Sequence, residues 1–105
     1  MSKRNKISKE TVESLRQMLI GIVQGVVDHP EDVHVNIVPA SYRLLAELHT
    51  NVSDVGQVIG KSGHVVDSIR SIISAYGGKH GIKVDLDFVT EQEKLGRKRA
   101  SAFGP

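Results

Sequence analysis

The chain has 105 residues, a formal net charge of +2 and no cysteine, and 39% of its residues are hydrophobic. A chain of this length forms one small domain, and the lack of cysteine excludes a disulfide framework and a thiolate metal site. The most apolar run, residues 18–27, has about half of the ~20 residues that a membrane span needs, so we expect a cytoplasmic protein with no membrane partner.

Positive charge is concentrated at the two ends of the chain. Residues 1–10 carry a net charge of +3 and residues 91–105 a net charge of +2, whereas residues 11–90 carry −3. We therefore predict a flexible basic N-terminal arm (1–10), one folded domain (11–90) and a polar, basic C-terminal tail (91–105). The sequence leaves open whether residues 94–99 of the tail add contacts to a polyanion.

Hydrophobic periodicity predicts the first three elements of the folded domain. Apolar residues at steps of three and four indicate a helix that begins near residue 11 and ends before Pro30, because proline cannot continue it. Alternation indicates one strand over residues 33–37 and a second over residues 43–52, with a turn at residues 39–41. These two strands pair most simply as a hairpin.

Two helices and a third strand follow, with a glycine loop between the helices. Residues 53–54 offer an N-cap for a short helix that ends at Gly60. A longer helix begins after Gly63, the glycine pair at residues 77–78 ends it, and alternation over residues 82–88 indicates the last strand. This order predicts an α+β sandwich in which helices pack on one face of a three-stranded sheet.

The Gly-Lys-Ser triplet at residues 60–62 has two interpretations. A P-loop follows a strand and needs a first glycine at position 55, but the chain has Val55, and Gly56 comes one residue too late. The sequence therefore argues against an NTPase. In the other interpretation, residues 60–63 form a G-x-x-G loop whose bare glycines let a sugar-phosphate backbone approach the positive end of the next helix.

The surroundings of this loop carry a family resemblance. The stretch VIGKSGHVV at residues 58–66, with Ile69 and Arg70 one turn further on, resembles the V-I-G-x-x-G-x-x-I signature of KH domains. The predicted element order matches the type II form, α-β-β-α-α-β. The chain is similar to small stand-alone bacterial KH proteins related to an RNA chaperone subunit that works with a Jag-family partner. The likeness covers about residues 11–90.

The resemblance implies a groove that holds about four unpaired RNA nucleotides between the glycine loop and a sheet edge. It implies three groups of RNA-binding residues. The loop residues Gly60, Lys61, Ser62 and Gly63 hold phosphates, and Val58, Ile59, Val66 and Ile69 form an apolar floor under the bases. His64 and Arg70 add further contacts. The four apolar side chains are equally compatible with a pure core role. Arg70 also fits a surface pair with Asp67, and His64 fits a solvated start of a helix.

Other classes of site receive no support from the sequence. No two histidines have helical i,i+4 spacing, and no Ser/His/Asp set or pair of carboxylates stands out, so we expect no enzyme activity, metal or cofactor. Proteins that bind single strands mainly by stacking bases need an interleaved aromatic set. The chain lacks one, because its aromatic residues are the scattered Tyr42, Tyr76, Phe88 and Phe103.

The resemblance implies a single-stranded RNA-binding protein that acts as an RNA chaperone or post-transcriptional regulator. It also implies an influence on the cell envelope, cell-wall biogenesis, cell shape and cell length, and a homodimer or a heterodimer with a Jag-family RNA-binding protein. The alternative hypothesis is a protein–protein assembly module whose partner supplies most of the RNA binding, because residues 11–90 are net acidic.

Overall fold

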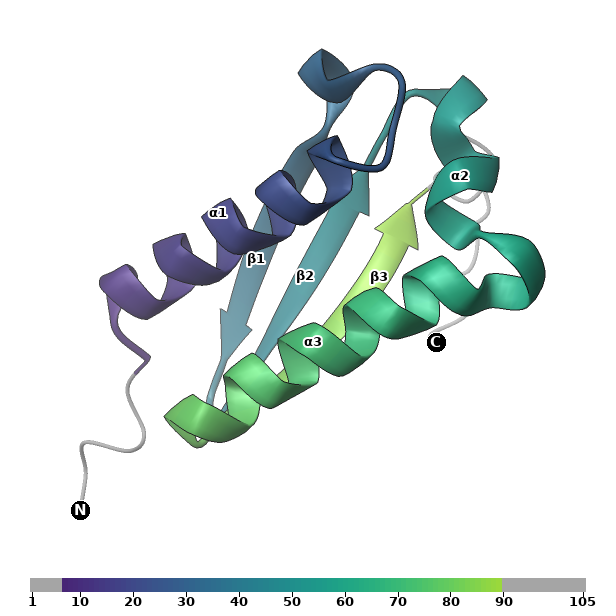
Figure 1. Ribbon diagram of the computed structural model, residues 1–105. Helices are drawn as coiled ribbons and strands as arrows, with labels where there is room; N and C mark the ends of the chain where they lie inside the picture. The colour runs from purple at the N-terminus through teal and green to yellow at the C-terminus, as the bar shows by residue number, and fades with distance from the viewer. Residues whose placement is uncertain (1–6, 90–105) are drawn as a thin grey trace, which may run out of the picture.

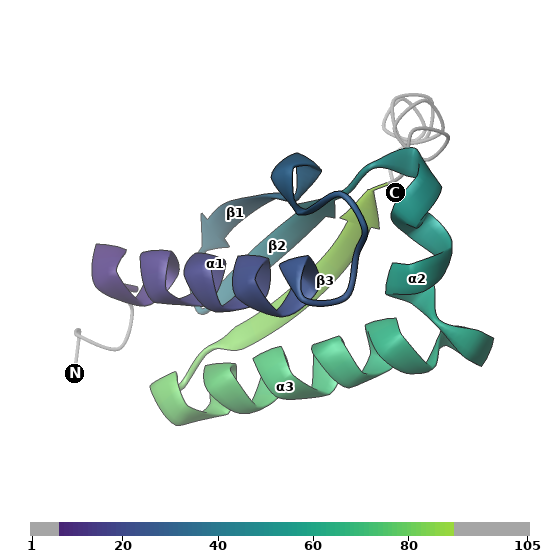
Figure 2. The same ribbon diagram turned by 45° about the horizontal axis from the view of Figure 1, so that its top comes forward.

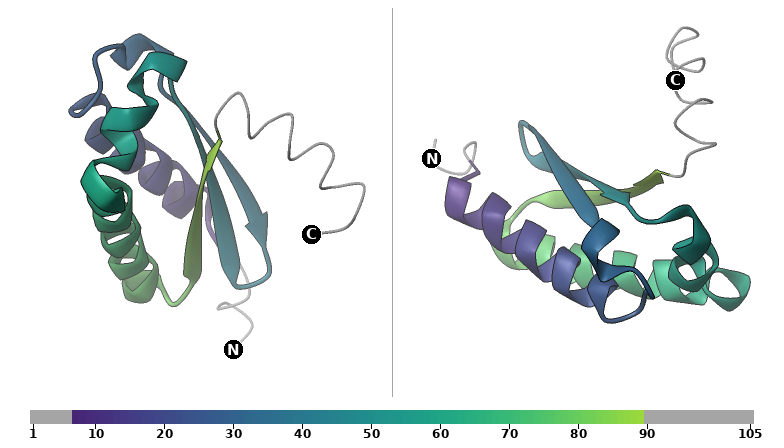
Figure 3. Two further views of the ribbon diagram at one scale, coloured as in Figure 1. Left: turned by 90° about the vertical axis from the view of Figure 1, so that its right-hand side faces the viewer. Right: turned by 90° about the horizontal axis from the view of Figure 1, so that it is seen from above.

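The structure is a computed structural model that describes residues 7–89, and it has two layers, a three-stranded sheet and a set of helices on one of its faces (Figures 1 and 3). The main elements are α1 (Lys9–Gln24), β1 (His34–Ala40), β2 (Arg43–His49), α2 (Val55–Ile59), α3 (His64–His80) and β3 (Lys83–Val89). Single turns of 3-10 helix lie at η2 (Pro30–Asp32), η3 (Val52–Asp54) and η4 (Lys61–Gly63). The predicted fold class and element order are confirmed.

Most of the predicted N-terminal arm and all of the predicted C-terminal tail lie outside the described residues. Within the described part, α1 begins inside the predicted arm. Its N-cap is Ser8, whose side chain accepts a hydrogen bond from the N–H of Thr11. No helix between residues 7 and 89 combines the length and the apolar character needed to cross a membrane.

The sheet has the order β1-β2-β3 and mixed strand directions. β1 and β2 form the predicted antiparallel hairpin, whereas β2 and β3 are parallel. Parallel neighbours need a crossover connection, and α2 and α3 provide it. The predicted turn is wrong at Pro39 and Ala40, which are still part of β1; the turn is Ser41–Tyr42. Because β1 is an edge strand, it tolerates a proline that cannot donate to a ladder.

One apolar core fills the space between the sheet and the helices. α1 and α3 lie side by side over the sheet, and α2 stands at one end of it (Figures 1 and 2). Alternate residues of each strand face these helices, and burying each large side chain stabilises the fold by about 1.5–3 kcal/mol. The fully buried side chains include Leu15, Leu19, Val23, Leu44, Leu48, Val58 and Ile73.

The end of α1 differs from the prediction. The helix ends at Gln24, and the N–H of Gly25 closes its last turn by donating to the carbonyls of Gly21 and Ile22 at 3.2 Å. Pro30 does not end this helix; it begins the separate turn η2. Val26, which lies beyond this end, is exposed.

The end of α3 differs from the prediction as well. The helix continues through Gly77 and Gly78 and ends at His80; the next residue, Gly81, has a left-handed conformation with φ 71° and ψ 26°. The N–H of Ile82 donates to the carbonyl of Gly77 at 2.9 Å, and that of Gly81 to Gly78 at 3.3 Å, the two bonds of a Schellman motif. A Cβ on Gly77 would lie 2.6 Å from the carbonyl oxygen of Ile82. Gly77 therefore permits a close approach of the chain and does not terminate the helix.

Candidate nucleic-acid interface

The GKSG segment forms a loop between α2 and α3 at one end of the molecule (Figure 1). Gly60 has φ 78° and ψ 174°, Ser62 has φ 55° and ψ 27°, and Gly63 has φ 78° and ψ 12°. Glycine adopts positive φ without the penalty that a Cβ imposes, so Gly60 and Gly63 take these conformations freely; Ser62 is the one non-glycine residue of the loop with positive φ. Lys61 and Ser62, at the tip, are exposed. The loop is therefore open to a ligand and not sealed inside the domain.

The two loop glycines are required for different reasons. A Cβ on Gly60 would overlap the side chain of Val65 and lie 2.8 Å from its backbone nitrogen, in the first turn of α3. A Cβ on Gly63 would have room, because its nearest neighbour would be Asp67 Oδ2 at 3.8 Å. At Gly63 the backbone conformation alone selects glycine, whereas at Gly60 close packing adds to it.

Main-chain hydrogen bonds close the loop and leave donors at its tip. The N–H of Gly60 donates to the carbonyl of Gly56 at 2.9 Å, the N–H of Gly63 to Gly60 at 3.1 Å, and the N–H of His64 to Lys61. None of these bonds uses the N–H of Lys61 or Ser62. Both residues adjoin the positive end of α3, where a helix attracts anions, and Lys61 adds an exposed ammonium group.

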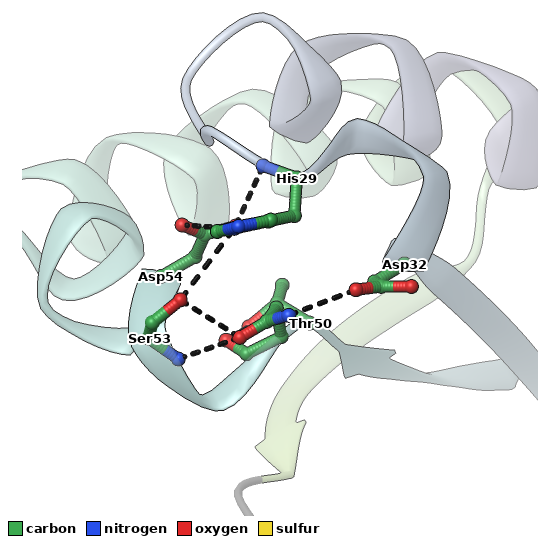
Figure 4. A network of polar contacts seen from close by, with 6 residues as sticks. His29, Asp32, Thr50, Ser53 and Asp54 are labelled. Carbon is green, nitrogen blue, oxygen red and sulfur yellow. Dashed lines mark hydrogen bonds and ion pairs between the residues drawn. The ribbon is translucent and has the colours of Figure 1, made fainter.

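A polar network holds the start of α2, the helix that leads into the loop (Figure 4). Asp54 is only 1% exposed, and it accepts a hydrogen bond from the N–H of His29 at 2.9 Å. His29 Nδ1 lies 3.2 Å from each carboxylate oxygen of Asp54. Asp54 is the N-cap residue of α2, within the predicted pair, but its side chain makes no capping bond to the helix. Asn51 caps the preceding turn, accepting from the N–H of Ser53 at 2.8 Å and donating to Asp32 at 2.9 Å.

Charge reinforces the contact between His29 and Asp54. The hydrogen bond between the His29 ring and the Asp54 carboxylate raises the pKa of His29 above the ordinary 6.5. Burial alone would raise the pKa of Asp54, but the hydrogen bonds from the ring and the N–H of His29 oppose it and lower the pKa below 3.8. The pair therefore ties the connection after α1 to the start of α2, and so helps to fix the position of the loop.

A groove of about 540 Å³ lies between α3 and the edge strand β3. Its lining comes from Arg70, Ser71 and Ser74 of α3 and from Lys83, Val84, Asp85 and Leu86 of β3. Within the described sheet β3 pairs with β2 alone, so the backbone of its other edge borders the groove. Because α3 begins directly after the GKSG loop, this helix connects the loop to the groove.

The sequence prediction missed four polar residues of this groove, Ser71, Ser74, Lys83 and Asp85. Helical spacing from Arg70 places Ser71 and Ser74 on the same side of α3 and was a usable signal. No comparable signal identified the two strand residues, because their distance from α3 depends on the crossover between β2 and β3.

The ten predicted RNA-binding residues fall into two structural groups. The loop residues 60–63 and the neighbouring His64 and Arg70 lie at the surface or partly exposed, and Ile59 is 38% exposed. Val58, Val66 and Ile69 belong to the hydrophobic core, and Val58 is 0% exposed.

Arg70 also makes the alternative contact that the sequence allowed. Its Nη1 lies 3.2 Å from Asp67 Oδ1. Both side chains are exposed, so this ion pair adds little to stability and leaves the guanidinium able to exchange partners.

The geometry of the described residues does not fit a P-loop or a cluster of metal ligands. The element before the GKS triplet is the helix α2, whereas a P-loop follows a strand. Among residues 7–89, no three His, Asp or Glu side chains are grouped so that they would hold a metal ion. The loop and the groove are thus the features of the described domain that point to a ligand.

The α-β-β-α-α-β order, the mixed sheet and the G-x-x-G loop between two helices together define a type II KH domain. The family model of the KhpA/KhpB KH domain matches residues 16–88, and the chain belongs to this family. The resemblance seen in the sequence is thereby confirmed.

Similar proteins align with between 62% and 74% of the chain. The "RNA-binding protein KhpA" of Chlamydia muridarum is 31% identical over 78 residues, which are 74% of this chain and 100% of the relative. The protein of the same name from Listeria monocytogenes is 33% identical over 75 residues, 71% of this chain and 99% of the relative. That from Mycobacterium tuberculosis is 35% identical over 65 residues, 62% of this chain and 80% of the relative.

Proposed function

We propose that this protein is a non-catalytic RNA-binding protein that holds a single-stranded segment between the GKSG loop and the edge of β3. The observation that carries the proposal is the exposed loop, with donors at the positive end of α3 and a groove alongside the same helix. The name of its relatives, "RNA-binding protein KhpA", supports the same class of ligand.

The backbone of the RNA lies on the loop in this proposal. The bare glycines allow a phosphate to approach the main chain, and the N–H groups of Lys61 and Ser62 donate to its oxygens. The Lys61 ammonium supplies a full positive charge, and His64 offers a ring nitrogen next to the loop. Such contacts do not depend on the sequence of the RNA.

The bases extend from the loop into the groove. Ile59 offers exposed apolar surface, while Val58, Val66 and Ile69 support the loop and α3 from the core. The hydroxyls of Ser71 and Ser74 and the backbone edge of β3 offer donors and acceptors to the Watson–Crick edges of unpaired bases. This arrangement contacts few nucleotides and predicts a modest affinity that falls with salt.

A modest affinity per domain favours a paired arrangement. Two linked domains on one RNA gain an effective concentration that one domain lacks. We infer a homodimer, or a heterodimer with a Jag-family RNA-binding protein, and note that Ile72 on α3 is 47% exposed and available to a partner. In the cytoplasm such an assembly acts as an RNA chaperone or post-transcriptional regulator of many transcripts, with effects on the cell envelope, cell shape and cell length.

The second candidate function is a protein–protein assembly module whose partner supplies most of the RNA binding. One observation favours it: the strands carry Glu47, Asp85 and Asp87, and residues 11–90 are net acidic. A negatively charged surface repels a polyanion such as RNA, except close to positively charged side chains. The two functions differ in whether the isolated chain binds RNA through its loop.

Fluorescence anisotropy with labelled single-stranded RNA separates the two. We expect Lys61→Asp combined with Ser62→Asp to weaken binding by at least about tenfold, because repulsion replaces attraction at the loop. The matched control is Lys9→Asp combined with Ser14→Asp, which makes the same charge change at exposed positions of α1, and it keeps the wild-type affinity within about twofold. Circular dichroism checks that both variants fold.

Unchanged RNA affinity in a folded loop variant would exclude loop-mediated binding and favour the assembly module. Crosslinking and recovery of bound RNA from cells, with wild type and the loop variant compared, tests the regulatory role. The same transcripts recovered in the same amounts from both proteins would contradict it. Purified protein is expected to show no nucleotide hydrolysis, and a measured turnover would contradict the non-catalytic assignment.

A further inference from the structure

We propose that a bound RNA strand continues past the groove onto a second contact surface at the β1–β2 turn. We name this the turn surface and define it by Tyr42, Arg43 and Lys83. The inference rests on the proposed function, because it extends the path of the same strand. The ligand it takes is the sugar-phosphate backbone and one base beyond those held in the groove.

Backbone contacts bring the three residues of the turn surface together. The N–H of Lys83 donates to the carbonyl of Tyr42 at 3.0 Å. Arg43 is the register partner of Lys83 in the parallel ladder of β2 and β3. The turn and the start of β3 lie near the C-terminal end of α3, opposite the GKSG loop (Figure 1).

The groove leads to this surface because Lys83 belongs to both. Lys83 lines the groove from the first position of β3, while Ser74 lines it from the second half of α3. A strand that enters at the GKSG loop and follows α3 therefore reaches Lys83 before it leaves the domain. Lys79, in the last turn of α3, adds a further positive charge at this end.

The side chains of the turn surface suit single-stranded RNA. Tyr42 is 51% exposed, and an aromatic ring stacks on any base without regard to its identity. The Arg43 side chain is 55% exposed, and its contact with Asp85 is a long one, 3.8 Å from Nη1 to Oδ2. An exposed pair at this distance is weak, so the guanidinium can exchange it for a bidentate contact with a phosphate.

A dependence of affinity on RNA length tests the inference. The probes are single-stranded RNA pools of random sequence, four and eight nucleotides long, titrated by isothermal calorimetry or NMR. A four-nucleotide RNA fills the groove, whereas an eight-nucleotide RNA also reaches the turn surface. We expect wild type to bind the longer pool at least about tenfold more tightly, in the range that one base–ring stack provides.

The diagnostic variant is Tyr42→Ala combined with Arg43→Gln, since neither residue lines the groove. It is expected to keep wild-type affinity for the short pool and to lose the gain with length. Its salt slope for the long pool falls by about 0.7, the value for one phosphate contact on a single strand. The matched control, Tyr42→Phe combined with Arg43→Lys, keeps ring and charge and therefore keeps the gain.

The outcomes separate this inference from the function on which it rests. If the diagnostic variant keeps the gain with length, or weakens both pools equally, the turn surface is not an extension of the RNA path. A wild type with no gain overturns the inference in the same way. If Lys61→Asp combined with Ser62→Asp binds both pools as wild type does, the proposed function itself fails. Thermal unfolding confirms that each variant is folded at the assay temperature.

Discussion

Replacing Gly60 by alanine is the sharpest single test of the loop geometry. Gly60 has φ 78° and ψ 174°, a region of backbone space that only glycine populates readily. A Cβ at this position would also overlap the Val65 side chain and lie 2.8 Å from the Val65 nitrogen. Gly63 is the matched comparison, because it has the same φ of 78° but open space where a Cβ would be.

The two substitutions differ in the number of penalties that apply. At Gly63 alanine meets only the left-handed penalty of about 1–2 kcal/mol. At Gly60 it meets backbone strain of about 1–3 kcal/mol. Overpacking against Val65 adds about 1–3 kcal/mol. We therefore expect Gly60→Ala to lower the free energy of unfolding by about 2–6 kcal/mol, a large fraction of the ~5–15 kcal/mol of a typical domain.

Urea unfolding followed by circular dichroism measures the difference. With a slope near 1 kcal/mol/M for a small protein, the midpoints of the two variants are expected to differ by at least about 1 M, with Gly60→Ala the lower. Equal midpoints would refute the reasoning, since they would mean that the Val65 contact does not constrain the loop. If Gly60→Ala is folded but binds RNA weakly, the substitution distorts the loop and not the rest of the fold.

Three further predictions concern the helix, the loop charge and the buried pair. Gly77→Ala is expected to destabilise the fold by at least about 1 kcal/mol, because the added Cβ would lie 2.6 Å from a carbonyl oxygen. Gly78→Ala has open space around its Cβ and is expected to stabilise the fold by up to ~1 kcal/mol. Urea midpoints in the reverse order would contradict this prediction. Lys61→Gln is expected to reduce the slope of log affinity against log salt by about 0.7, and an unchanged slope would show that Lys61 contacts no phosphate. The destabilisation caused by His29→Gln is expected to be largest between pH 3.8 and 6.5, because the raised pKa of His29 and the lowered pKa of Asp54 leave both groups charged there. This destabilisation becomes smaller as the pH rises through the raised pKa of His29, and also as the pH falls through the lowered pKa of Asp54. A difference in thermal stability that does not depend on pH would rule out the ion pair.

The fold could be predicted from the sequence because its elements have strong periodicity. β2 and β3 alternate clearly between buried and outward-facing residues, and the helical stripe of α1 matches its buried face. The loop could be predicted because glycines at positions 60 and 63 are required by local backbone geometry, which a sequence motif records directly.

The helix ends could not be predicted because tertiary contacts decide them. Glycines stand at positions 77, 78 and 81, and each is a reasonable C-terminal signal by local rules. In the structure Gly77 packs against the carbonyl of Ile82, so the helix passes through Gly77 and ends at His80, just before Gly81. In the same way, Asp54 fits an N-cap locally, but its partner His29 lies 25 residues earlier in the chain.

Hydrophobic periodicity also does not distinguish core residues from apolar residues that would lie under bound bases. Val58, Val66 and Ile69 have the spacing of the apolar face of a helix, which serves both roles equally well. The structure places them in the core and leaves Ile59 as the exposed apolar residue beside the loop. The polar residues Lys83 and Asp85 reach the groove only because β3 returns parallel to β2 and next to α3.

The loop owes its shape to supports outside itself. α2 has five residues, far fewer than an isolated helix needs to be stable, so tertiary contacts must hold it. Val58 anchors it in the core, Asp54 ties its start to His29, and Gly60 packs closely on Val65. Because all of these contacts are made within the protein, they hold the donors at the tip in position, and the proposed RNA binding would not have to order them. Changes at Lys61 should therefore alter affinity alone, whereas changes at the supports should alter affinity and stability together.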